Sequence, residues 1–194
     1  MITEQTNKIK IRDRTVEYTV EYRKVKYIRY ELKYGKLRLV IPSRDKTDIE
    51  QIIHKKEGWI YRKLCAYDDE SKKLNEKTRN MRLEQRTMQK LRQLVNSYME
   101  EYEKLLNVRV NRVQFRDTVY KWGSCSINRN VTLSKNLRYL PDKLVAYIVY
   151  HELVHIIVLA HNDRFFEIME REFPNYEEYD EKLKEYQFLI EREC

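Results

Sequence analysis

The chain has 194 residues, of which 42% are hydrophobic and 36% are charged, with only three glycines and three prolines. This balance excludes a disordered polypeptide, and the length favours one domain with a small additional subdomain. No run of about 18 uncharged apolar residues occurs, so no membrane-spanning helix is expected. The N-terminus lacks the apolar centre of a signal peptide, and the three cysteines form no CxxC pair, so we expect a cytoplasmic protein.

The net charge of +8 is unevenly distributed along the chain. Residues 1–64 contain 17 Lys and Arg against 9 Asp and Glu, residues 65–140 contain 16 against 9, and residues 141–194 contain 6 against 13. A solvated surface on which acidic residues compensate the basic ones explains this pattern. A basic N-terminal region that contacts nucleic acid explains it equally. Charge alone therefore does not decide between these two interpretations.

The first third of the sequence is predicted to be β-rich. Four segments alternate with period two and are rich in Val, Ile and Tyr, namely 8–12, 16–22, 27–33 and 36–41. A hairpin turn is expected at 34–36. Pro42 ends the sheet, and a helix is expected from about Asp48 to about Leu64. We therefore predict an N-terminal β-rich subdomain with a closing helix at residues 1–65.

The stretch 66–82 has no apolar periodicity and is predicted to be a connector. After it, the spacing of apolar residues predicts an amphipathic helix over 83–105. Strands are expected at 108–115 and 131–133. Between these strands, the segment 121–126 is rich in turn residues.

Two further helices are predicted in the last third of the chain. Pro141 stands at the start of a helix over 144–159 that is apolar on nearly every face, as is typical of a buried helix. Asn162 is a favourable N-cap for the next helix, which Pro174 ends. Residues 83–194 are thus predicted to form the second domain, and the fold class is α+β.

The predicted buried helix contains the sequence His-Glu-Leu-Val-His at 151–155. Its histidines are four residues apart, so they lie only ~40° apart around the helix, one turn above the other. Two imidazoles can then reach one ion from a rigid element, and Glu152 points beside that ion, where it can hold a water. The pattern indicates a zinc site, and a catalytic zinc also needs a third protein ligand and one open position.

His161 is the first candidate for the third ligand. On an unbroken helix it would lie ~240° from His155 and face away from the ion, so the chain must turn between Val158 and His161. The N-cap that follows His161 indicates such a break. Glu170 and Glu172 are alternative ligands. In metzincins a glycine makes the turn at the position that Val158 occupies here, which excludes that family.

The zinc motif is accompanied by other distinctive stretches. They are Lys-Trp-Gly-Ser-Cys-Ser at 121–126, Val-Thr-Leu at 131–133, Leu-Pro at 140–141 and His-Asn-Asp-Arg-Phe-Phe at 161–166. Together these stretches resemble the YgjP-like metallopeptidases, which are relatives of the SprT-like zinc peptidases. The resemblance implies a zincin-like catalytic domain, with His151, His155 and His161 as zinc ligands and Glu152 as the catalytic base.

The segment 121–126 has two interpretations. It either passes beside the metal, where Gly123 lets the backbone approach a ligand, or packs as core around a tight turn. The second is favoured, because Trp122 and Cys125 pack readily without a ligand. Cys125 as a zinc ligand that keeps an enzyme latent is a minor alternative. Candidates for stabilising an oxyanion, on position alone, are Tyr139, Tyr147, Tyr150 and Tyr176.

The sequence therefore predicts a zinc-dependent metallopeptidase that hydrolyses a protein or peptide by means of a metal-bound water, with Glu152 as general base. The alternative is a nucleic-acid-associated protein that binds through its basic region 1–140, with a zinc site that acts on DNA-bound proteins or is structural. A structural zinc site has no use for a base and normally fills four positions, which favours the peptidase. The substrate and the oligomeric state are not determined by the sequence.

Overall fold

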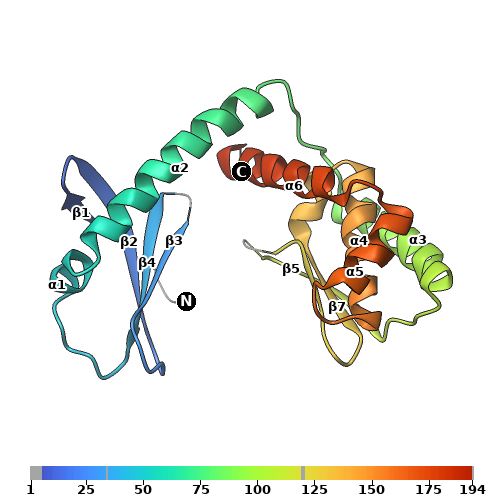
Figure 1. Cartoon of the computed structure of the whole chain (residues 1–194), viewed down its shortest axis with the longest axis horizontal. Helices are drawn as coiled ribbons and strands as arrows, with labels where there is room; N and C mark the ends of the chain where they lie inside the picture. Colours follow the sequence, from blue (N-terminus) through green and yellow to red (C-terminus); the bar gives the residue numbers. More distant parts are fainter. Residues whose placement is uncertain (1–5, 34, 119–120, 194) are drawn as a thin grey trace. The chain divides into compact units, whose positions relative to one another are not determined.

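The structure is a computed structural model that describes residues 6–33, 35–118 and 121–193 (Figure 1). The chain divides into two compact units, an N-terminal unit that ends at Glu76 and a C-terminal unit that begins at Lys77. Each unit has its own β-sheet and its own apolar core. The predicted α+β class is confirmed. Among the described residues, no helix combines the length and the apolar character needed to cross a membrane.

The N-terminal unit is a four-stranded sheet with helices packed on one face. Its strands, in the spatial order β1-β2-β4-β3, are β1 (Asn7–Ile11), β2 (Arg14–Arg23), β4 (Lys36–Pro42) and β3 (Arg29–Lys33). The central strands β2 and β4 are parallel, and the two outer pairs are antiparallel. All four predicted strands are thus present, within a few residues of their predicted ends.

Alternation along the strands creates the core of this unit, because every second side chain points to the same face. Leu37, Leu39 and Ile41 of β4 are buried against helices α1 (Ile49–His54) and α2 (Glu57–Thr78). Gly35 joins β3 to β4 with a φ of +72°, a conformation that glycine adopts without strain. Tyr34, which is part of the predicted turn, lies outside the described residues.

The helix predicted over 48–64 is in fact two helices. The side chain of Asp48 caps α1 by accepting a hydrogen bond from the amide of Gln51 at 3.3 Å. The amide of Lys56 then donates to the carbonyl of Ile53 at 3.0 Å. This three-residue step tightens the last turn and closes α1 before α2 begins at Glu57.

The stretch 66–82, predicted to be a connector, is helical as far as Thr78. It lacks apolar periodicity, but Ala66, Leu74 and its Glu and Lys residues have high helix propensity. Contacts at its start hold it to the sheet, because Arg14 donates to the carboxylate of Asp68 and the ring of Tyr67 lies beside Gly35. The two units divide within this stretch, at Glu76–Lys77, but its helix was not predicted, because helix formation does not require an apolar stripe.

The C-terminal unit is a three-stranded sheet packed with helices. The sheet has the order β5-β7-β6, with β5 (Arg112–Arg116) parallel and β6 (Gly123–Cys125) antiparallel to β7 (Asn130–Ser134). The helices are α3 (Met88–Leu106), α4 (Asp142–Ile157), α5 (Asp163–Glu172) and α6 (Tyr176–Glu193). Strand β6 lies in the segment predicted to be turn-rich, and helix α6 follows Pro174, where no helix was predicted.

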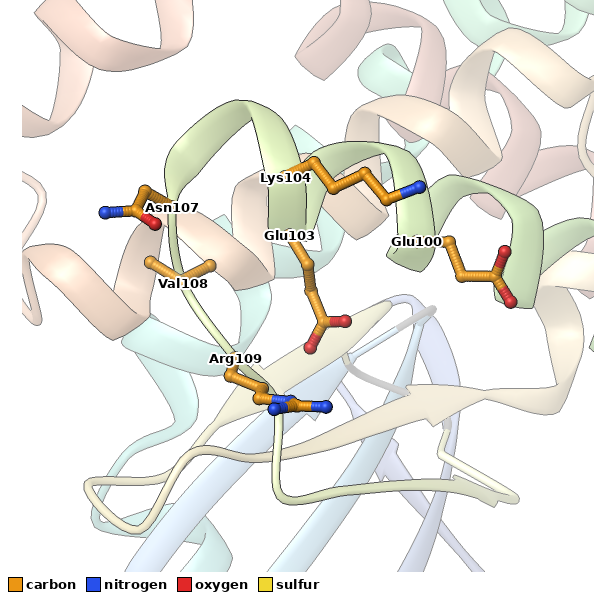
Figure 2. Close-up of a pocket in the computed structure, with 6 residues that line it drawn as sticks. All are labelled: Glu100, Glu103, Lys104, Asn107, Val108 and Arg109. Atoms are coloured by element: carbon orange, nitrogen blue, oxygen red, sulfur yellow. The ribbon is translucent and has the colours of Figure 1, made fainter.

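The C-terminal end of α3 closes directly into the chain that leads to β5 (Figure 2). Asn107 adopts a left-handed conformation, and the carboxylate of Glu103 accepts a hydrogen bond from the amide of Val110 at 2.5 Å. The strand was predicted to begin at residue 108. These contacts explain why β5 begins instead at Arg112. An open pocket of about 420 Å³ is lined here by Glu100, Glu103, Lys104, Asn107, Val108 and Arg109.

Helix α4 is the centre of the core of the C-terminal unit. All its residues from Leu144 to Tyr150 are buried, as are Leu153 and Val154. The carbonyl of Pro141 accepts from the amides of Leu144 and Val145 at 3.0 and 3.2 Å, so the helix begins where the proline predicts. The prediction of a buried helix is confirmed.

Arg86 fixes the start of this helix. Its side chain is only 11% exposed and donates to the carbonyls of Leu137, Arg138 and Leu140, the last at 2.9 Å. It also pairs with Asp142 in the first turn of α4. The residues just before α3, predicted to be part of that helix, are instead used to hold the segment that precedes α4.

Replacing Arg86 by Met is expected to destabilise the C-terminal unit by about 2–3 kcal/mol, because the guanidinium's hydrogen bonds to the carbonyls of Leu137, Arg138 and Leu140 are lost, and no other described group donates to the carbonyl of Leu140. Urea denaturation followed by Trp122 fluorescence, in a Trp59→Phe background, measures this unit alone. Arg82→Met removes an exposed arginine from the same segment and should leave the midpoint unchanged. Equal shifts in both variants would show that Arg86 has no special role.

Candidate metal centre and active site

The last two turns of α4 carry His151, Glu152 and His155. The ring centroids of the two histidines are 4.9 Å apart, as their four-residue spacing predicts. The helix ends at Ile157, and Val158 is extended, with φ −135° and ψ 109°. The chain therefore leaves the helix at the point where the sequence requires a break.

This break returns His161 to the first two histidines. Its Nε2 atom lies 3.1 Å from Nε2 of His151, and its ring centroid lies 4.6 Å from that of His155. One potential ligand atom from each of the three residues can be chosen so that all lie within 4.8 Å of one another. His151 and His155 are half-buried, whereas His161 is exposed, so the group is open to solvent on one side.

Phe165 supports all three imidazoles from α5. Its ring centroid lies 4.9 Å from that of His151, 4.8 Å from that of His155 and 4.7 Å from that of His161. Asn162 caps α5 by accepting from the amide of Phe165 at 3.2 Å, which fixes where this helix begins. The predicted cap thus positions the ring that packs on the three histidines.

The protonation of His155 follows from one hydrogen bond. Its Nδ1 atom lies 3.1 Å from the carbonyl oxygen of Val158. A carbonyl can only accept, so Nδ1–H is the donor, and Nε2 keeps a free lone pair. Such a bond orients a ligating imidazole and makes it more basic. The residue that breaks the helix therefore also prepares His155 to bind a metal.

Burial keeps the two helical histidines uncharged. Burial, together with the nearby His155 and His161, lowers the pKa of His151 to about 3. Burial also lowers the pKa of His155, against the opposing effect of its hydrogen bond to Val158. An imidazole must be neutral to ligate a metal, so both residues are ready to do so at neutral pH.

Glu152 is buried beside this group. It is 5% exposed, and its Oε2 atom has no hydrogen-bond partner among the described residues. Burial raises the pKa of Glu152 to about 8, and Lys121 acts in the opposite direction. A buried carboxyl group without a partner is costly to keep, and such groups concentrate at functional sites.

Gly123 of β6 lies against this carboxylate. A Cβ atom at residue 123 would be 2.5 Å from Oε1 of Glu152, so no larger residue fits without displacing the carboxylate. The favoured interpretation of the segment 121–126 as plain core packing is therefore wrong for Gly123. It is correct for Trp122 and Cys125, which are partly buried against the core.

The alternative site residues lie elsewhere. Among the described residues, the group of potential ligands contains neither Glu170 nor Glu172, which are exposed on α5, and it does not contain Cys125. Burial and the charge of Glu152 raise the pKa of Cys125 to about 11, so this side chain is a thiol at neutral pH. Cys65 and Cys125 are free, and Cys194 lies outside the described residues.

The candidate tyrosines are engaged in the fold. The hydroxyl of Tyr147 donates to Asp180 at 2.8 Å, and that of Tyr150 donates to the carbonyl of Ile168 at 3.1 Å. Tyr176 stacks on Phe166, and Tyr139 contacts the guanidinium of Arg138. Sequence reasoning connected Gly123 with the metal only in the less favoured interpretation of 121–126, and it did not identify Phe165 as a site residue, because only the fold brings Gly123 against Glu152 and Phe165 against His151.

Two histidines four residues apart on a helix, with a glutamate after the first, are typical of metalloproteases. The comparison with known families agrees. A family model described as "YgjP-like, metallopeptidase domain" matches residues 66–186, which is more than half of the chain and includes the whole site. The chain belongs to this family, and the resemblance found in the sequence is confirmed.

Two solved structures are similar to parts of the chain. The metallopeptidase zymogen of Pyrococcus abyssi abylysin is 22% identical, with a TM-score of 0.43, over 46% of this chain and 90% of that chain. The metallopeptidase zymogen of Methanocaldococcus jannaschii jannalysin is 24% identical, with a TM-score of 0.38, over 54% and 90%. No curated protein matches the chain.

A Gly123→Ala substitution is expected to lower peptidase activity about 100-fold while metal content stays unchanged, because the new methyl group displaces the carboxylate of Glu152. Turnover and bound metal should be measured on the same sample. Ser124→Ala changes the neighbouring exposed residue of β6 and should keep full activity. Full activity of Gly123→Ala would show that the position of this carboxylate does not matter.

The third ligand can be assigned by metal affinity. His161→Ala should weaken zinc binding by more than the roughly 10–100-fold that loss of an outer-shell partner causes. Glu170→Ala and Glu172→Ala should leave the affinity unchanged. Competition with a chromophoric chelator measures all three variants. If one glutamate variant loses affinity and His161→Ala does not, the ligand is that glutamate.

Proposed function

We propose that this protein is a zinc-dependent metallopeptidase in which His151, His155 and His161 hold the ion and Glu152 is the general base. The observation that carries the proposal is the convergence of three imidazoles from two separate segments beside a buried carboxylate without a partner. Membership of a metallopeptidase family supports the same reaction class.

The donor set suits zinc. A tetrahedral ion with Zn–N bonds of about 2.0–2.1 Å separates its ligand nitrogens by about 3.3 Å. The Nε2 atoms of His151 and His161 lie 3.1 Å apart, which is close to that value. Three neutral imidazoles are suitable ligands for zinc, and three protein ligands leave the fourth position free for water or substrate.

When bound, zinc lowers the pKa of a coordinated water and polarises the carbonyl group of the substrate. Glu152 removes the proton from the attacking water and delivers it to the nitrogen of the leaving amine, as the C–N bond breaks. Burial of Glu152 strengthens its affinity for that proton in the interval between the two transfers. Gly123 has no side chain, so the carboxylate of Glu152 can occupy the space beside it.

A structural zinc centre is the competing assignment. Such centres normally fill all four positions with protein atoms, whereas the group among the described residues has three members. A structural centre also gives no reason for burying a carboxylate beside it.

Cytoplasmic localisation stays a prediction of the sequence.

Glu152→Gln should retain about one zinc per chain and lose about 10²–10⁴-fold in peptidase turnover, because the amide cannot accept the proton. His151→Ala should lose both the metal and the activity. Zinc content by atomic absorption and hydrolysis of casein and of quenched peptides measure the two properties separately.

Glu167→Gln is the matched control, since it makes the same chemical change at an exposed position of α5 and should behave like the unmodified protein. Undiminished hydrolysis by Glu152→Gln would exclude Glu152 as the base. Undiminished hydrolysis by a zinc-free His151→Ala protein would exclude the metal centre altogether.

A further inference from the structure

The sheet of the N-terminal unit has two unlike faces. The helix-facing side carries Leu37, Leu39 and Ile41 of β4, whereas the buried Val40 has a register position on the opposite side. The register places Lys36 and Arg38 of β4 on the other face, together with Lys8 and Lys10 of β1 and Arg29 of β3. We call this second side of the sheet the basic face.

The glutamates of the basic face are already paired. Glu17 pairs with Lys8 at 3.5 Å, Glu31 pairs with Arg38 at 3.0 Å, and Glu21 contacts both Arg38 and Arg23. The Lys8–Glu17 pair is exposed and contributes little to stability, whereas the pairs of Arg38 with Glu21 and Glu31 are partly buried. They do, however, neutralise the acids of this face within the unit itself.

Cations of the basic face also lie outside these ion pairs, and three of them are considered as phosphate contacts. Lys10, Arg29 and Lys36 are exposed, and they form no ion pair with any described residue. Lys10 and Lys36 lie two strands apart, about 10 Å across the sheet. Arg29 is level with Val40, four residues along β4 from Lys36, or about 13 Å. The positive charges are therefore spread over the face and not concentrated at one point.

We infer that the basic face binds the phosphate backbone of duplex nucleic acid, without preference for base sequence. Regularly spaced negative charges complement cations spread over such a surface. The tyrosines of the described strand residues, including Tyr18 and Tyr30, have helix-facing register positions, so the described part of the basic face lacks the aromatic platforms on which single-stranded bases stack. A purely electrostatic surface favours the duplex, because its charge density is highest.

The inference concerns the N-terminal unit and does not depend on the proposed peptidase activity. Fluorescence anisotropy of a labelled random-sequence DNA duplex with the full-length protein tests it. With three phosphate contacts, the logarithm of the binding constant should fall against the logarithm of salt concentration with a slope of about −3. A triple variant, Lys10→Gln, Arg29→Gln and Lys36→Gln, should bind at least about 10-fold more weakly and lose most of that slope.

A second triple variant is the matched control. Lys63→Gln, Lys72→Gln and Lys73→Gln remove the same charge from exposed positions of α2, in the same unit. This variant should retain the affinity and the salt slope. Thermal melting of both variants checks the fold, and if the first triple variant unfolds, the double variant Lys10→Gln and Lys36→Gln should still lose about two thirds of the slope.

Several outcomes would overturn the inference. Absence of duplex binding at low salt would exclude a nucleic-acid surface. Equal losses of affinity in the two triple variants would show that only the net charge of the unit matters, and not the basic face. Competition by polyglutamate as effective as by unlabelled duplex would identify an acidic protein as the partner instead. Tighter binding of single strands than of duplex would also contradict it. Equal binding of DNA and RNA duplexes supports recognition of the shared phosphate backbone.

Discussion

The candidate metal centre depends on the place where α4 stops. An apolar helix in the core holds His151 and His155 rigidly, but a straight continuation would carry His161 away from them. The extended backbone of Val158 prevents this and offers its carbonyl to Nδ1 of His155. Asn162 then starts α5, which brings Phe165 under the three imidazoles. One change of backbone direction thus sets the arrangement of the three imidazoles, the tautomer of His155 and the packing beneath all three rings.

The buried carboxyl group of Glu152 is unfavourable for stability, and its proposed role in the reaction explains why it is present. Its buried carboxyl group would be replaced by an apolar side chain if stability alone were selected, because an unpartnered polar atom in the core is unfavourable. The surrounding structure leaves room for it instead, since Gly123 lacks the side chain that would fill the same space. Burial raises the pKa of this carboxyl group to about 8, which is close to the pH range that the proposed acid–base role requires.

Local patterns in the sequence predicted local structure well. Alternation predicted the strands of the N-terminal sheet, and the spacing of His151 and His155, with the cap at Asn162, predicted the break that places His161. The failures are of two kinds. The helix beyond Leu64 lacks an apolar face and is held by contacts such as Arg14 with Asp68, which are distant in sequence. The role of Gly123 is also non-local, because only the fold brings it against Glu152.

The two proposals place charge in opposite environments, and this makes them physically separable. At the candidate metal centre, Glu152 is buried and His151 and His155 are half-buried, so ionic strength changes their interactions less than those of exposed charges. The cations of the basic face are exposed, and their attraction to phosphates is screened within about 10 Å at 0.1 M salt. Raising the salt concentration should therefore release nucleic acid from the N-terminal unit while hydrolysis of a short neutral peptide continues. Any salt dependence of hydrolysis that appears only when nucleic acid is present would then arise from delivery of the substrate and not from the chemistry at Glu152.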